Sequence, residues 1–270
     1  MVNQAIARAT GYELTRAGSP PPATGRHKRI DRLVERPTFI LTSVRSGSTL
    51  LRVILDSHSM ICAPHELHLR TLRVQIDQRY GVESMRQIGL DERRLEYLLW
   101  DRVLHRELVA SGKSIIVDKT PNSVFVWERL HEAWPKARYV FLLRHPAAIA
   151  DSLYRARKDP VLADVRTRVV EYTQKIDEAR KGLPGITVRY EDLVKDPERI
   201  TTEICAHLDV PWERSMIDYG AVDHGPFKPR IGDWSAKIRS GRIDTELVLP
   251  ADDEIPDVLR PACRSWGYLG

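Results

Sequence analysis

The sequence has little cysteine, no long apolar segment and no long run of charge of one sign. Its three cysteines, Cys62, Cys205 and Cys263, lie far apart among 270 residues and form no C-x-x-C pair. This spacing argues against a disulfide framework and against a zinc cluster. No apolar run approaches the ~18 residues that a membrane helix needs, and residues 1–18 contain no apolar signal core. We therefore expect a reduced, cytoplasmic protein without a membrane span.

The net charge of the chain indicates the sign of charge that its ligand carries. The chain carries 42 Lys and Arg residues against 37 Asp and Glu residues, a formal net charge of +5. A basic balance favours an anionic ligand or partner. The basic residues are scattered among acidic ones, and Phe and Tyr do not interleave with them as in a platform that stacks bases. We expect no nucleic-acid partner; a basic nucleic-acid-binding module is kept as an alternative that predicts steeply salt-dependent binding.

The amino-terminal segment differs from the rest of the chain. Residues 18–25 are Gly, Ser, Pro, Ala and Thr only, with three consecutive prolines, and a short basic cluster follows over residues 26–29. Such a stretch forms neither a helix nor a central strand. The remainder has the length of one domain, and 42% of the whole chain is hydrophobic. We predict a peripheral tail and linker over residues 1–36 and a single domain over residues 37–270.

Four short apolar segments alternate with helical patterns. The segments read as buried strands because they are rich in β-branched and aromatic residues and have no polar face. Alternation of this kind predicts an α/β fold, a parallel β-sheet flanked by helices on both faces. The predicted strands cover residues 38–41, 114–117, 138–143 and 186–190, and the predicted helices cover residues 48–55, 69–79, 91–111, 124–134, 147–157, 160–181 and 197–208.

The segment that joins the first strand to the first helix is suited to an anion. Arg45 is a fixed cation, Gly47 lets a ligand approach the backbone, and Ser46, Ser48 and Thr49 carry hydroxyl groups. The start of a helix leaves N–H groups unpaired and carries partial positive charge. Ser48 or Thr49 could simply cap the helix, but a cap does not need an arginine, a glycine and three hydroxyl groups within five residues. The pattern favours a phosphate or sulfate group.

This loop does not have the pattern of an ATPase. The motif G-x-x-x-x-G-K-[ST] requires another glycine before Gly47 and a lysine after it, and both are absent. A kinase-like, nucleotide-dependent phosphotransferase would also need a carboxylate for magnesium, and none stands out. That enzyme class is the first alternative.

Further candidate residues follow the strands. His65 and His68 flank Glu66 shortly after the loop, which suggests acid–base chemistry; a solvent-facing loop is the plainer interpretation, and the spacing is not that of H-E-x-x-H. Lys119 and Arg144 come directly after the second and third predicted strands, at the edge where open α/β sheets bind ligands. Lys119 could instead be a surface residue, and Arg144 could pair with a nearby carboxylate.

Four segments, taken in chain order, resemble sulfotransferases that use 3′-phosphoadenosine 5′-phosphosulfate (PAPS). Residues 45–49 resemble the 5′-phosphosulfate loop of that family, and residues 139–152 resemble its 3′-phosphate segment. Residues 188–193 resemble its next strand, and residues 232–234 resemble its late basic loop. The likeness runs from residue 37 to residue 242 and is strongest, segment by segment, to tyrosylprotein sulfotransferases and bacterial sulfotransferases. It implies a P-loop NTPase-like sulfotransferase fold.

The resemblance also implies roles for single residues. Arg45 and Lys119 would neutralise charge on the transferred group, and Arg144 with Ser152 would hold the 3′-phosphate. Tyr190 would pack near the cofactor. The cofactor-binding residues implied are Arg45, Ser46, Gly47, Ser48, Thr49, Leu50, Arg144, Ser152, Tyr190, Lys237 and Arg242. The cofactor implied is PAPS, with adenosine 3′,5′-bisphosphate as product and no metal ion.

Two residues compete for the role of general base. Residues 45–66 can be laid on the tyrosyl enzymes without a gap, which places Glu66 on their catalytic glutamate and His65 beside it. A histidine side chain titrates near neutral pH without help from its surroundings, so His65 is the alternative base. The acceptor would be a hydroxyl group of a small molecule, a glycolipid or a carrier-bound metabolite of bacterial secondary metabolism. An acyl carrier protein could dock on residues 1–36.

Overall fold

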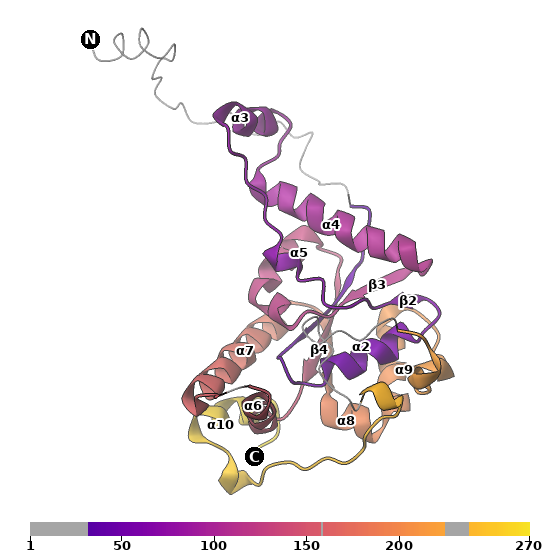
Figure 1. Ribbon diagram of the computed structural model, residues 1–270, viewed down its shortest axis with the longest axis vertical. Coiled ribbons are helices and arrows are strands. Elements are labelled where there is room, and N and C mark those ends of the chain that lie inside the picture. The colour runs from indigo at the N-terminus through magenta and orange to yellow at the C-terminus, as the bar shows by residue number, and fades with distance from the viewer. Residues whose placement is uncertain (1–31, 158, 225–237) are drawn as a thin grey trace, which may run out of the picture.

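The computed structural model describes residues 32–157, 159–224 and 238–270. Within these residues, five strands form one sheet in the order β2-β3-β1-β4-β5, and every neighbouring pair is parallel (Figure 1). The strands are β1 (Thr38–Thr42), β2 (Ile61–Cys62), β3 (Ile115–Asp118), β4 (Arg138–Leu143) and β5 (Gly185–Arg189). The predicted α/β fold with a parallel sheet is confirmed.

Helices cover both faces of this sheet (Figure 1). The covering helices are α2 (Ser48–Asp56), α4 (Glu92–Ser111), α5 (Trp127–Ala133), α6 (Pro146–Arg155), α7 (Leu162–Gly182), α8 (Tyr190–Lys195), α9 (Pro197–Leu208) and α10 (Arg260–Ser265), and one further helix, α3 (Arg79–Gln87), contributes no buried residue. Most of the helices predicted from the sequence lie within two or three residues of these bounds, because their apolar positions recur at helical spacing.

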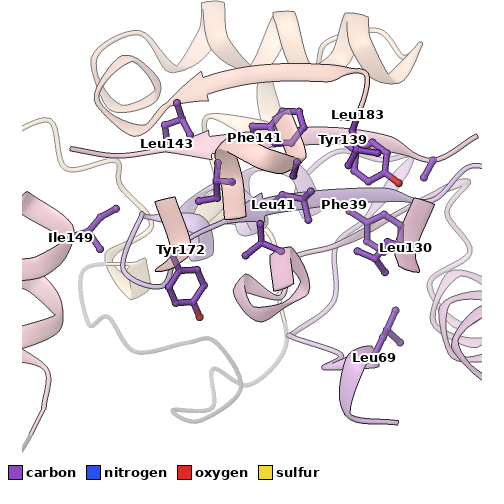
Figure 2. Packing of buried hydrophobic residues seen from close by; sticks show 14 of the residues in the cluster. Phe39, Leu41, Leu69, Leu130, Tyr139, Phe141, Leu143, Ile149, Tyr172 and Leu183 are labelled. Carbon is purple, nitrogen blue, oxygen red and sulfur yellow. The ribbon is translucent and has the colours of Figure 1, made fainter. Parts of the chain in front are cut away.

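Alternating side chains of the central strands explain why the fold has two apolar layers. Phe39 and Leu41 of β1 join a core with α4, α5, α6, α7 and α10, whereas Ile40 joins a core with α2, α8 and α9. Successive side chains of a strand point to opposite faces, so an unbroken apolar strand has to be covered on both sides. Figure 2 shows the first core, where Phe39 lies beside Tyr139 of β4 with ring centroids 6.1 Å apart.

The helix predicted over residues 69–79 is wrong. The structure has only a 3-10 turn at η2 (Leu69–Thr71), an extended segment and then α3, which lies beyond α4 and away from the sheet (Figure 1). The backbone N–H groups of Val74 and Ile76 donate to the carboxylates of Glu96 and Glu92 on α4. Tertiary hydrogen bonds to a later helix therefore replace the hydrogen bonds of a local helix.

The division into a tail over residues 1–36 and a domain over residues 37–270 stays a prediction. Residues 1–31 lie outside the described part of the chain, while the N–H groups of Leu33 and Val34 donate to Asp101 of α4 at 2.7 and 3.1 Å. None of the described helices combines the length and the hydrophobicity needed to cross a bilayer.

Candidate functional site

The loop between β1 and α2 has the backbone shape that the sequence suggests. Arg45 has φ 64° and Gly47 has φ 82°, and α2 begins directly after Gly47. A Cβ atom on Gly47 would lie 2.2 Å from two ring carbons of Tyr190, so only glycine fits between the loop and this ring. The glycine is therefore required twice, for its left-handed conformation and for the close approach of Tyr190.

The hydroxyl group of Ser46 is used inside the loop. The Ser46 side chain is fully buried, donates to the carbonyl of Ser43 at 2.7 Å and contacts the hydroxyl of Thr42. Thr42 in turn donates to the Leu142 carbonyl of β4. The serine thus holds the shape of the turn, while Ser48 and Thr49 of the first helical turn line the adjacent cavity.

Arg144, Arg155 and Ser152 of α6 lie around Arg45. Arg45 Nε donates to Ser152 Oγ at 3.1 Å, and Arg144 donates to the Arg45 carbonyl at 2.8 Å with its guanidinium 4.7 Å from the centre of the Tyr190 ring. Burial and the positive charges of Arg144 and Arg155 lower the pKa of Arg45. Carboxylates also line the adjacent cavity, but among the described residues none forms an ion pair with Arg45, Arg144 or Arg155. A bound anion would relieve this repulsion.

A cavity of about 440 Å³ opens beside this cluster at the carboxyl ends of the strands. Its size is in the range of small-molecule and cofactor sites. Predicted site residues from five different segments meet on its wall, although they are separated by up to 197 positions of sequence (242 − 45). The predicted residues that line it are Arg45, Gly47, Ser48, Thr49, Leu50, Glu66, Arg144, Ser152, Tyr190 and Arg242.

Glu66 lies between Lys119 and His68, and Lys119 is the more deeply buried of the two. Lys119 is buried, and its ammonium group donates to Glu66 Oε1 at 2.7 Å. His68 Nε2 lies 3.5 Å from the other carboxylate oxygen, and the His68 side chain is partly exposed. A carboxylate that faces a cavity and is bonded to a buried lysine can accept a proton there, and the lysine can neutralise charge beside it.

A second carboxylate, that of Asp118, is bonded to the segments on either side of Glu66 and Lys119. Asp118 at the end of β3 is fully buried, and the hydroxyl of Thr120 donates to it at 3.0 Å. Burial raises the pKa of Asp118 to about 6, against the opposing effect of hydrogen bonds from Thr120 and the Leu67 backbone. The Thr120 hydroxyl also accepts from the His68 backbone N–H at 3.3 Å. Asp118 thus connects the loop that carries Glu66 to the loop that follows Lys119.

Some predicted site residues lie elsewhere. His65 is exposed and is not part of the cavity wall, so the histidine beside Glu66 is His68. Lys237 lies outside the described residues. Sequence reasoning did not identify Arg155 or Asn122 on the cavity wall. Arg155 could have been found, because it follows Ser152 by three residues on the same helix and therefore shares its face.

Residues 37–214 match the profile described as the sulfotransferase family. The nodulation protein NoeE of Sinorhizobium fredii is 28% identical over 63% of this chain and 49% of its own length. Protein-tyrosine sulfotransferase 1 of Danio rerio is 25% identical over 67% of this chain and 55% of its own length. The chain thus spans only about half the length of these curated relatives.

A solved structure supports the same fold. The sulfotransferase domain from the curacin biosynthetic pathway superposes with a TM-score of 0.67 at 23% identity, and the superposition covers 88% of this chain and 99% of that domain. The family profile covers well over half of the chain, and the fold agrees with it. The chain therefore belongs to the sulfotransferase family.

Proposed function

We propose that this protein is a PAPS-dependent sulfotransferase that acts on a hydroxyl group. The observation that carries the proposal is the cluster of Arg45, Arg144 and Arg155, which lies beside an anion-binding loop and in which, among the described residues, no arginine forms an ion pair with a carboxylate. Such a group fits a ligand with negative charge at two ends, and the cavity it borders is large enough for a nucleotide.

The residues of the cavity divide naturally between the two charged ends of this cofactor. The N–H groups from Gly47 to Leu50, with the hydroxyls of Ser48 and Thr49, would bind the 5′-phosphosulfate at the start of α2. Arg144 and Ser152 would bind the 3′-phosphate, with Arg242 closing from the later segment. When bound, PAPS supplies the sulfuryl group, and adenosine 3′,5′-bisphosphate is the product that leaves.

Glu66 is the proposed general base. It lines the cavity and would take the proton of the acceptor hydroxyl, whereas the alternative base His65 lies outside the cavity wall. Lys119 would stabilise negative charge that develops on the oxygens of the phosphosulfate. Aimed donors of this kind are typically worth ~3–4 kcal/mol to a transition state. Arg45 would share this task after release from Ser152.

The acceptor is proposed to be a small molecule, a glycolipid or a carrier-bound metabolite in a bacterial cell. One structural relative is named for a biosynthetic pathway and one curated relative for nodulation, which supports a metabolite as acceptor, whereas the name of the Danio rerio relative points to a protein tyrosine. An acyl carrier protein as a partner, a cytoplasmic location and a reaction without metal or nucleic acid belong to the same proposal.

Ligand binding and sulfate transfer test this function directly. Calorimetric titration should show binding of adenosine 3′,5′-bisphosphate and none of ATP, because the loop lacks the lysine of an ATPase. A screen with labelled PAPS and phenols, sugars and acyl-carrier hydroxyls should then identify the acceptor. Binding of ATP in place of the bisphosphate would favour the alternative, a nucleotide-dependent phosphotransferase.

A further inference from the structure

Tyr219 is a buried residue of the cavity wall that is hydrogen-bonded to the segment carrying Arg242. It belongs to the 3-10 turn η5 (Tyr219–Ala221), is 1% exposed, and its hydroxyl donates to the backbone carbonyl of Arg242 at 2.9 Å. Burial raises the pKa of Tyr219, so the phenol keeps its proton and stays a donor. Arg242 and Tyr219 both line the cavity.

The backbone beside this hydrogen bond is in direct contact. A Cβ atom on Gly220 would lie 2.5 Å from the Cα of Gly241, and a Cβ atom on Gly241 would lie 2.7 Å from the Cα of Gly220. Gly241 also has φ 69°, in the left-handed region. Two glycines packed back to back leave the residue that follows Gly241, which is Arg242, little freedom to shift relative to Tyr219.

The backbone of Tyr219 is connected to α2 through His224. The Tyr219 carbonyl lies 3.1 Å from Nε2 of His224, and Nδ1 of His224 lies 2.9 Å from Oδ2 of Asp56 at the end of α2. His224 and Asp56 are largely buried, and Lys113 lies 3.6 Å from the other oxygen of Asp56. The same nine-residue helix therefore carries the anion loop at its start and the support of Tyr219 at its end.

We propose that Tyr219 is a positioning residue that fixes Arg242 at the nucleotide end of the cavity, an inference that rests on the proposed function. The loop of residues 45–49 and Arg242 come from distant parts of the chain. Both are connected to α2, a helix about 13 Å long: the loop at its start, and Arg242 at its end through Tyr219. Tyr219 does not need to touch the nucleotide to act. It removes the conformational freedom that Arg242 would otherwise lose on binding.

A double-mutant cycle with adenosine 3′,5′-bisphosphate tests this inference by calorimetry. Tyr219→Phe removes only the hydroxyl that donates to Arg242, and we expect it to weaken binding about five- to tenfold. Arg242→Ala should weaken binding at least as much. In the Arg242→Ala background, Tyr219→Phe should have no further effect, because the residue that it positions has lost its guanidinium.

Controls separate this inference from the proposed function. Tyr80→Phe, at a tyrosine that is 77% exposed on α3, should bind like the wild type. If Tyr219→Phe does not fold, Gly241→Ala disturbs the same contact from the other side and should weaken binding in the same way. An unchanged affinity of Tyr219→Phe, or an equal loss in both backgrounds, overturns this inference alone. A wild-type protein that does not bind the bisphosphate overturns the proposed function and this inference with it.

Discussion

Gly47→Ala gives the sharpest test of how the anion loop is built. The new Cβ atom would lie 2.2 Å from the Tyr190 ring, and alanine would have to adopt φ 82°. The left-handed conformation costs ~1–2 kcal/mol, and the overpacking costs a further ~1–3 kcal/mol. We therefore expect the free energy of unfolding to fall by about 2–5 kcal/mol and the melting temperature to fall by on the order of 10 °C.

A matched glycine separates the two contributions. Gly112 has φ 66°, but nothing lies within 4 Å of the place where its Cβ would be. Gly112→Ala should therefore cost only the backbone part, ~1–2 kcal/mol. Replacing Tyr190 by alanine should reduce the cost of Gly47→Ala to that of Gly112→Ala. The free energy of unfolding of all four variants can be measured by chemical denaturation. An equal cost of Gly47→Ala with and without the Tyr190 ring would show that the ring does not exclude a side chain at Gly47.

Three further predictions concern the carboxylates and the lysine. Glu66→Gln should lower turnover by about 10²–10⁴-fold while His65→Ala stays near wild type; the opposite pattern would make His65 the base. Lys119→Ala should lower turnover about 100-fold or more and leave the affinity for adenosine 3′,5′-bisphosphate within a few-fold; a large loss of affinity with normal turnover would contradict its role in the transition state. Burial raises the pKa of Asp118 from 3.8 to about 6. Because the buried carboxyl resists ionisation, it destabilises the fold increasingly as pH rises through this window. The free energy of unfolding of Asp118→Asn, relative to that of the wild type, should therefore increase by ~3 kcal/mol between pH 3.5 and pH 7. A relative stability that does not change with pH would show that the pKa of Asp118 is the same in the folded and the unfolded protein.

The parts of the fold that the sequence predicts best are those with continuous apolar runs. Strand β4 was expected over residues 138–143 and is found at Arg138–Leu143, because a run of this kind is stable only between two covered faces. Strand β2, by contrast, was not predicted. It has two residues, Ile61 and Cys62, and it is a strand only because β3 lies beside it, a relation that local sequence does not contain.

The limits of the site prediction have a similar origin. The anion loop is a local motif, so its position and its neighbour Arg144 could be inferred from residue types and strand ends. Which of two histidines approaches Glu66 depends on a single backbone conformation, since His68 has φ 50° and its N–H is held by Thr120. That conformation is set by tertiary hydrogen bonds, and the spacing of residues 65–68 does not reveal it.

A crystal structure of the protein with adenosine 3′,5′-bisphosphate tests the central proposal most directly. We expect the 5′-phosphate at the N–H groups that begin α2, beside Ser48 and Thr49, and the 3′-phosphate between Arg144 and Ser152. A nucleotide bound elsewhere on the molecule, or a loop that stays empty at saturating concentrations, would contradict it.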